Sequence, residues 1–173
     1  MVTRFYRAPE IMLSSHEYSK AVDMWSIGCS FAEVMTGKVL FPGENYIQQV
    51  NLIIEKRGTP DRETMAMVSN ENAKKYITSL EEKQKINLSE IIPSANKLAL
   101  DLLDKMLDLN PIRRITVEEA LKHPYLEQLH EPEDEPTFEG EIDFTFEYNP
   151  KLSLEELEKL IMKEISCYPS FSA

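Results

Sequence analysis

One apolar, helix-length run at residues 19–37 constrains the fold more than any other stretch of this sequence. Its apolar residues do not fall on one stripe, and a helix that is apolar all round needs neighbours on all sides. Ser19 is expected to cap the helix, Asp23 lies where a carboxylate favours the helix dipole, and Gly37 fits a left-handed stop. The run therefore predicts a buried central helix with the rest of the chain packed around it.

Further helices are expected on the C-terminal side of this run. Asn45 is expected to cap a helix that ends near Arg57 and stops at Gly58. Thr59 and Pro60 then predict the start of a short helix, since a hydroxyl cap followed by proline is a common helix beginning. The sequence thus predicts two helices separated by one glycine.

The second half of the chain is also predicted to be helical. A helix is expected at 71–78 and a strongly amphipathic one at 95–107, whereas 80–93 is polar and irregular. Capping boxes at 116–119 and 153–156 predict two more helices. The last helix is expected to turn four apolar side chains inward: Leu157, Leu160, Ile161 and Ile165. Strand content is close to nil, with 142–148 the only alternating stretch, so the fold class is mainly α.

Composition limits the possible functions. The formal net charge of -11 argues against a nucleic-acid surface, which needs clustered Lys and Arg. No run of eighteen apolar residues and no signal-peptide core occurs, and Cys29 and Cys167 read as free thiols in a reducing compartment. The acidic residues concentrate at 127–158, which favours basic partners there. We therefore expect an intracellular protein without a membrane or nucleic-acid partner.

Three ordered motifs carry a family resemblance: Ala8-Pro9-Glu10, then Asp23-Met-Trp-Ser-Ile-Gly28, then Arg113-Arg114-Ile115. In this order they resemble the C-terminal lobe of a eukaryotic protein kinase. Five further stretches resemble the mitogen-activated branch: residues 2–13, 41–43, 58–60, 120–126 and 132–136. The resemblance implies a partial kinase lobe at 1–126, a helical bundle around one buried central helix. An extended acidic docking strap and a final helix are expected to follow at 127–173.

The resemblance also shows which catalytic motifs are missing. The five glycines form no Gly-x-Gly, and neither His-Arg-Asp nor Asp-Phe-Gly occurs. We therefore expect the chain to begin inside the activation segment, to retain no catalytic residue and to be inactive by itself. ATP and magnesium are implied for the complete family member, not for this chain. His16, His123 and His130 lack metal-ligand spacing, so no metal site is expected.

The resemblance implies roles for residues of the first turns. Thr3 and Asp23 match residues that support the catalytic loop, although a loop threonine and a helix-dipole carboxylate are sufficient alternatives. Arg4 and Arg7 match the pair that binds the activation-segment phosphate and shapes the pocket for the proline after the target residue. Two guanidinium groups so spaced suit anion capture, and a solvated cation pair is the alternative.

Three more groups are implied by the same resemblance. Glu10 and Arg114 match a buried structural ion pair. Glu131, Asp134 and Glu135 match an acidic docking patch, with a solvated charge run as the alternative. Six further residues match a hydrophobic docking pocket of the family, with ordinary core packing as the alternative: Met12, Leu13, Tyr46, Ile47, Val50 and Tyr76.

These residues lead to two functional hypotheses. In the first, the chain is part of a proline-directed, mitogen-activated-type serine/threonine kinase of the cytoplasm or nucleus. Its partners are then protein substrates, upstream kinases and phosphatases with basic docking motifs. In the second, the chain is a non-catalytic docking module that competes for such partners.

Overall fold

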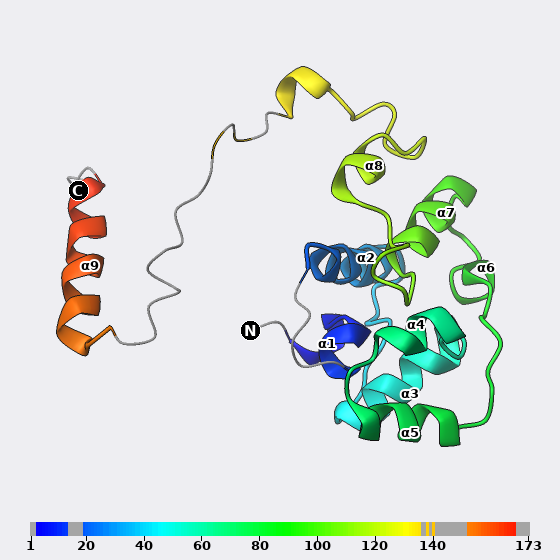
Figure 1. Cartoon of the computed structure of the whole chain (residues 1–173). Helices are drawn as coiled ribbons and strands as arrows, with labels where there is room; N and C mark the ends of the chain where they lie inside the picture. The colour runs from blue at the N-terminus through cyan, green and yellow to red at the C-terminus, as the bar shows by residue number, and fades with distance from the viewer. Residues whose placement is uncertain (1–2, 14–18, 136–137, 139, 141–151, 169–173) are drawn as a thin grey trace. The chain divides into compact units, whose positions relative to one another are not determined.

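The computed structural model describes residues 3–13, 19–135, 138, 140 and 152–168. They belong to two compact units, Met1–Glu131 (unit 1) and Pro132–Ala173 (unit 2). Figure 1 shows that the described residues are helices joined by loops, with no strand among them. The mainly α fold predicted from the sequence is confirmed.

Unit 1 contains one 3-10 helix and eight α-helices within its described residues. In chain order they are η1 Arg4–Tyr6, α1 Pro9–Leu13, α2 Ala21–Thr36, α3 Tyr46–Arg57, α4 Arg62–Met67, α5 Glu71–Ser79, α6 Leu88–Ile91, α7 Lys97–Met106 and α8 Val117–Leu121. Unit 2 contains η2 Pro132–Asp134 and α9 Leu154–Cys167.

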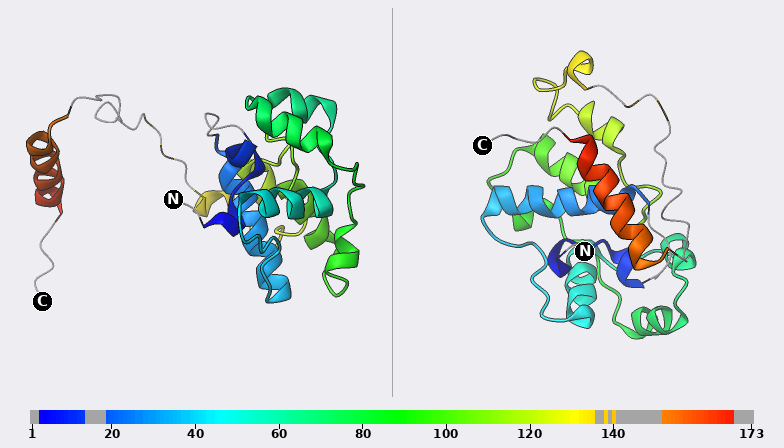
Figure 2. Two further views of the ribbon diagram at one scale, coloured as in Figure 1. Left: turned by 90° about the horizontal axis from the view of Figure 1, so that it is seen from below. Right: turned by 90° about the vertical axis from the view of Figure 1, so that its left-hand side faces the viewer.

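The core of unit 1 is built on α2, as predicted. Trp25 and Cys29 are buried and pack in one cluster with Leu103 and Leu107 from α7 and the residue after it. Figures 1 and 2 show α2 and α7 side by side, and both η1 and α7 contact α2. Gly28 permits this approach, because a Cβ there would lie 3.0 Å from Met106 Cβ. The amphipathic helix predicted at 95–107 is therefore the one that covers α2.

Neighbours in unit 1 cover only part of the apolar surface of α2, since Ile27 and Val34 are 49% and 83% exposed. One expectation for α2 is wrong, that of its cap. Ser19 does not cap the helix: the cap position is Lys20, which has helical dihedral angles and forms no side-chain cap bond. A capping side chain needs an extended backbone at the cap. The stop at Gly37 is confirmed by its φ of 67°.

The predictions around α3 were right about its ends and wrong about the next helix. The Asn45 side chain accepts from Gln48 N, and Gly58 ends the helix with a φ of 85°. However, α4 is capped by Asp61, whose carboxylate accepts from Thr64 N at 2.8 Å. The Thr59 hydroxyl instead accepts from Lys83 N at 2.9 Å. A contact with a distant loop has therefore replaced the predicted cap.

The stretch predicted to be irregular, 80–93, contains the short helix α6. Asn87 caps it by accepting from Ser89 N at 3.0 Å. Leu88 and Ile92 are 4% and 2% exposed and belong to the main core cluster. Burial of Leu88 and Ile92 in the core thus stabilises a helix that the local sequence does not predict.

In unit 2, the predicted capping box at the start of α9 is confirmed, since Ser153 and Glu156 exchange both bonds. The prediction that α9 turns apolar residues inward, against the rest of the chain, stays a prediction. None of the α9 side chains is buried within the described residues. The four apolar residues in question are 41–59% exposed: Leu157, Leu160, Ile161 and Ile165. The weak alternating stretch at 142–148 lies outside the described residues.

Candidate functional site

The segment from Thr3 to Arg7 is fixed on α2 through Tyr6. The backbone turns once, with Tyr6 N donating to Thr3 O at 3.1 Å. The Ser26 hydroxyl donates to Tyr6 O at 2.8 Å, and the Tyr6 hydroxyl donates to Glu33 Oε2 at 2.7 Å. The Glu33 carboxylate, helped by burial, raises the pKa of Tyr6. One side of this segment is therefore attached to two turns of α2.

The other side of the segment is held by Gln49, a residue that the sequence analysis missed. Its side chain is completely buried. Its Nε2 donates to Phe5 O at 3.4 Å, while its Oε1 accepts from Gly43 N at 3.0 Å. A Cβ on Gly43 would lie 2.4 Å from that oxygen, so only glycine fits there without a shift. The spacing of Gln49 from the buried Ile53 could have indicated its inward position.

Arg4 and Arg7 both reach the loop and helix start that follow α2. Arg4 Nε donates to Gly43 O at 2.8 Å, and its Cζ lies 5.6 Å from the Phe5 ring centroid. Arg7 Nη1 donates to the Tyr46 hydroxyl, with its Cζ 5.4 Å from that ring centroid. The two guanidinium groups thus contact Gly43 O and the Tyr46 hydroxyl, which belong to residues three apart in the sequence.

Thr3 and Asp23 lie at the start of η1 and in the first turn of α2, and both are exposed. No hydrogen bond joins their side chains in the part of the chain that the structure describes. The predicted role of these two residues therefore remains a prediction.

Glu10 and Arg114 form a bidentate ion pair across unit 1. Arg114 Nη1 and Nη2 donate to the two Glu10 carboxylate oxygens at 2.6 and 2.9 Å. The Arg114 side chain is 0% exposed and the Glu10 side chain is 9% exposed. Arg114 also donates to Ala21 O at 2.7 Å and to Asp108 O at 3.0 Å. Its Cζ lies 5.1 Å from the Trp25 ring centroid. This arginine therefore joins α1, the start of α2 and the loop before α8.

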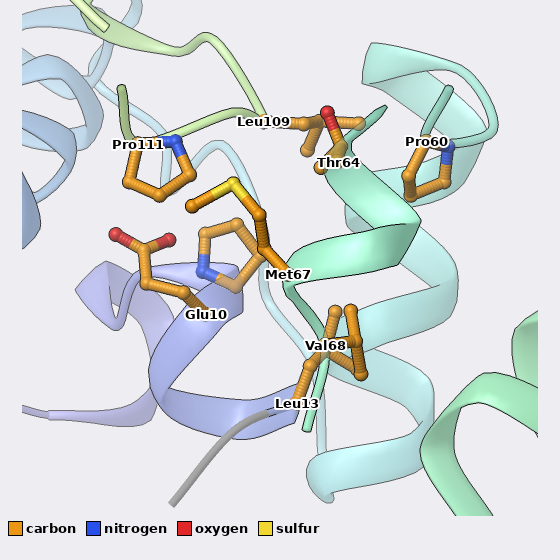
Figure 3. A pocket seen from close by; sticks show the side chains of 9 residues that line it. Glu10, Leu13, Pro60, Thr64, Met67, Val68, Leu109 and Pro111 are labelled. Carbon is orange, nitrogen blue, oxygen red and sulfur yellow. The ribbon is translucent and has the colours of Figure 1, made fainter. Parts of the chain in front are cut away.

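A small cavity lies beside this ion pair (Figure 3). Its volume is about 30 Å³, close to the share of one water molecule in the liquid. The Met67 side chain lies in the middle of the group and points toward Pro111. The cavity is lined by Pro9, Glu10, Leu13, Pro60, Thr64, Met67, Val68, Leu109 and Pro111. It is too small for a nucleotide.

The structure divides the predicted hydrophobic docking residues into two sets. Leu13 and Val50 are 8% exposed and belong to a core cluster, against which Met12 and Tyr76 pack. The Tyr76 hydroxyl donates to Asn51 Oδ1 at 2.8 Å. Tyr46 and Ile47, on the first turn of α3, are 52% and 60% exposed. Four of the six are thus part of the core or packed on it, and two are open to a partner.

The predicted acidic docking residues fall at the boundary of the two units. Glu131 is the last residue of unit 1 and is exposed. In unit 2, Asp134 is exposed in η2, and Glu135 directly follows it and is half-buried. Glu133 is an additional exposed carboxylate in η2. Each unit therefore contributes at least one exposed carboxylate at this place in the chain.

The described residues offer no metal site, because no three metal-ligating side chains gather among them. Within the same ranges, the helices are all too short or too polar to cross a membrane.

Comparison with known proteins gives one matching family and many relatives. The model of the protein kinase domain matches residues 1–126. Mitogen-activated protein kinase mpkB of Aspergillus fumigatus is 51% identical over 169 residues, which are 95% of this chain and 48% of the relative. Mitogen-activated protein kinase 5 of Arabidopsis thaliana is 47% identical, and spm1 of Schizosaccharomyces pombe is 46% identical, each over 95% of this chain. They are matched over 43% and 39% of their own lengths. The chain thus spans about half the length, or less, of the relatives it matches.

Proposed function

Because this chain belongs to the protein kinase family, we propose that it is part of a proline-directed, mitogen-activated-type serine/threonine kinase. The complete enzyme transfers phosphate from ATP to serine or threonine of a protein. Residues 1–126 supply the helical part of the kinase domain, and 127–173 supply an acidic docking strap and a final helix. The two unpaired cysteines agree with a cytoplasmic or nuclear location.

The observation that carries this proposal is the clamping of the Thr3 to Arg7 segment. Ser26 and Gln49 hold consecutive carbonyls, those of Tyr6 and Phe5, from two different helices. A recognition loop that is already fixed loses little conformational freedom when a substrate binds. Arg4 and Arg7 then keep a constant position on this segment. The proposal assigns to them the anion of the activation segment and the pocket for the substrate proline.

The described residues do not fit magnesium, because no set of three carboxylate, imidazole or thiol groups comes together in the described ranges. A kinase of this family holds ATP under a glycine-rich loop, and the sequence contains no Gly-x-Gly. We therefore assign to this chain substrate recognition and structural support. The reacting atoms belong to a part of the complete enzyme that these residues do not contain.

The first test begins with the transcript 5′ of the Met1 codon. The proposal expects an in-frame glycine-rich loop, His-Arg-Asp and Asp-Phe-Gly. The product of that complete frame should phosphorylate a Ser-Pro peptide in preference to the matched Ser-Ala peptide. A frame without these motifs, or a product without Ser-Pro activity, would sink the proposed kinase.

A pair of variants in the complete product tests the clamped segment itself. Gln49→Ala should reduce the ratio of kcat/KM between the Ser-Pro and Ser-Ala peptides, because Phe5 O and Gly43 N lose their common partner. Gln84→Ala, a change of the same kind at an exposed position, should leave that ratio unchanged. Equal ratios for both variants would remove the role assigned to the clamp.

The strap suggests a second role, the docking of basic segments of substrates, upstream kinases and phosphatases. Glu131, Glu133 and Asp134 are exposed and lie within four residues of sequence. Attraction between exposed charges depends on salt and is screened within about 10 Å at 0.1 M ionic strength. A basic peptide should therefore bind this chain more tightly at low salt. Tyr46 and Ile47 would receive an apolar side chain of the partner.

The docking role is tested on the chain itself. Glu131→Lys plus Asp134→Lys should weaken binding of a basic peptide about ten-fold, equivalent to about 1.4 kcal/mol. Glu82→Lys plus Glu158→Lys makes the same change of charge at one exposed position in each unit, and should alter the affinity little. Equal losses for the two double variants would show attraction by net charge alone. A chain that binds the peptide without kinase motifs upstream would favour the non-catalytic docking module.

A further inference from the structure

Tyr46 combines exposure with an arginine at its hydroxyl group. It is the first residue of α3 and is 52% exposed. Arg7 Nη1 donates to its hydroxyl oxygen. Arg4 reaches the same loop, with Nε on Gly43 O at 2.8 Å, three residues before Tyr46. A group added to this hydroxyl would therefore enter a region that already holds a guanidinium.

The other described tyrosines have different surroundings. The Tyr6 hydroxyl donates to Glu33 Oε2 at 2.7 Å, so a negative group there would face a carboxylate. The Tyr76 hydroxyl donates to the Asn51 amide oxygen at 2.8 Å and is half-buried. Tyr168 is 69% exposed and follows the C-terminal end of α9, where the helix dipole disfavours an anion. The Tyr125 ring packs on Phe31, with the ring centroids 5.5 Å apart. Among the described tyrosines, Tyr46 is the one whose hydroxyl group accepts from an arginine.

We propose that Tyr46 is a tyrosine phosphorylation site and that Arg7 holds its phosphate, in competition with the activation-segment anion that the proposed function assigns to the same arginine. The donor is ATP, used by a tyrosine-phosphorylating protein kinase. The Tyr46 oxygen forms a bond to the γ-phosphorus while the bond from that phosphorus to the β–γ bridging oxygen breaks. ADP leaves with the bridging oxygen, and the hydroxyl proton passes to a base of the modifying kinase.

Three physical features stabilise the product. A tyrosine phosphate carries about -1.5 to -2 charges at neutral pH and has three acceptor oxygens. A guanidinium can donate two parallel bonds to such a group, and the acceptor oxygens are only two bonds beyond the hydroxyl oxygen that Arg7 already contacts. Tyr46 also opens a twelve-residue helix, where the dipole favours negative charge. Glu44 is the nearest acidic residue in sequence, and it is exposed, so water and salt screen its repulsion.

Phosphorylation would also change the surface on which we place a partner's apolar side chain. The phosphate would add charge beside Ile47 and reduce binding of an apolar docking segment. This consequence rests on the proposed docking function, whereas capture of the phosphate by Arg7 does not. The test therefore measures the phosphate itself.

The experiment uses the full chain, a tyrosine-phosphorylating kinase and ATP, with the modified residues mapped by mass spectrometry. Phosphorus NMR then follows the second ionisation of each phosphate as the pH changes, with resonances assigned through Tyr46→Phe and Tyr168→Phe. Because a nearby cation favours the dianion, the Tyr46 phosphate should titrate about one pH unit below the Tyr168 phosphate. The ordinary value is about 6.

Arginine variants separate capture by Arg7 from a general effect of charge. Arg7→Ala should raise the pKa of the Tyr46 phosphate toward that of Tyr168, and Arg7→Lys should raise it less. Arg62→Ala removes an exposed arginine elsewhere in unit 1 and should leave the titration unchanged. Failure to modify Tyr46 after exhaustive reaction overturns the proposal. So does a Tyr46 phosphate whose titration equals that of Tyr168 and ignores both Arg7 variants.

Discussion

The helices α6 and α9 show two different origins of helical structure in one chain. Helix α6 has four residues, too few to be stable by itself, yet its first residue, Leu88, and the residue after it, Ile92, are 4% and 2% exposed. Helix α9 has fourteen residues, a capping box and a Glu155–Lys159 ion pair, and buries none of its side chains. In unit 1 the burial of neighbouring side chains therefore stabilises a helix with few local signals, whereas in unit 2 the signals that favour α9 lie in its own sequence.

Because of this difference, we expect a substitution to affect stability differently in the two units. In unit 1, the loss of one buried contact should spread to every helix that shares the core. In unit 2, the loss of a local signal should be confined to α9. The single tryptophan, Trp25, lies in the core of unit 1, so its fluorescence reports that unit alone. Far-ultraviolet circular dichroism reports helices in both.

The two thiols should give the largest contrast. Cys29 is 1% exposed, and burial raises its pKa to about 12, whereas Cys167 is exposed. The thiolate is the reactive form and has an ordinary pKa near 8.5, so this shift alone lowers the reactivity of Cys29 on the order of 10³-fold. Alkylation at neutral pH, mapped by mass spectrometry, should modify Cys167 and leave Cys29 intact. In denaturant both should react; equal rates in buffer would contradict the described core.

The next largest effect is expected from the buried ion pair. Glu10→Ala leaves the Arg114 guanidinium, which is 0% exposed, without its charged partner. This should lower the free energy of unfolding of unit 1 by about 3–5 kcal/mol. Urea unfolding followed by Trp25 fluorescence measures the change. Glu82→Ala, at an exposed position, is the matched control and should shift the midpoint little.

A pair of smaller changes compares the same local motif in both units. Ser153 and Thr116 each form a capping box, in α9 and α8 respectively. Replacing either by Ala should cost about 1 kcal/mol. Ser153→Ala should reduce the dichroism signal without moving the Trp25 transition, whereas Thr116→Ala should move that transition. A shift of the Trp25 transition by Ser153→Ala would show that the two units are energetically coupled.

The smallest effect concerns Asp61 at the start of α4. Hydrogen bonds from Thr64, and then from Arg113, lower the pKa of Asp61 to about 2. Since the folded value is below the ordinary value near 3.9, this stabilisation is present above about pH 4 and is lost as the pH falls toward about 2. Asp61→Asn keeps a capping oxygen and removes the charge. The Trp25 midpoint of this variant should depend less on pH in that window; an unchanged slope would assign the dependence to other groups.

Local signals explain what the sequence could predict of this fold. Three helix caps accept a hydrogen bond from the backbone N–H three residues later, so the residues near each cap are enough to predict it: Asn45, Thr116 and Ser153. Gly37 and Gly58 end helices through positive φ angles that glycine adopts readily. These five positions were predicted and are confirmed.

The missed features depend on distant segments. The Thr59 hydroxyl accepts from Lys83 N and so does not cap the helix as predicted. The buried Gln49 side chain has its partner, Phe5 O, 44 residues away in the sequence. Similarly, nothing in the letters of α2 distinguishes the exposed Val34 from its buried apolar neighbours. In the candidate site, Glu10 and Arg114 lie 104 residues apart. Family resemblance suggested that pair, and no spacing rule connects it.

Gln49 also has a consequence for the exchange of backbone protons with solvent. The Gly43 N–H belongs to a loop, where amide protons ordinarily exchange quickly, yet it donates to a completely buried side chain of α3. Its deuteration should therefore wait for an opening of α3 and be as slow as that of Ile53 on the inner face of that helix. A loop residue would then carry the protection of a core residue.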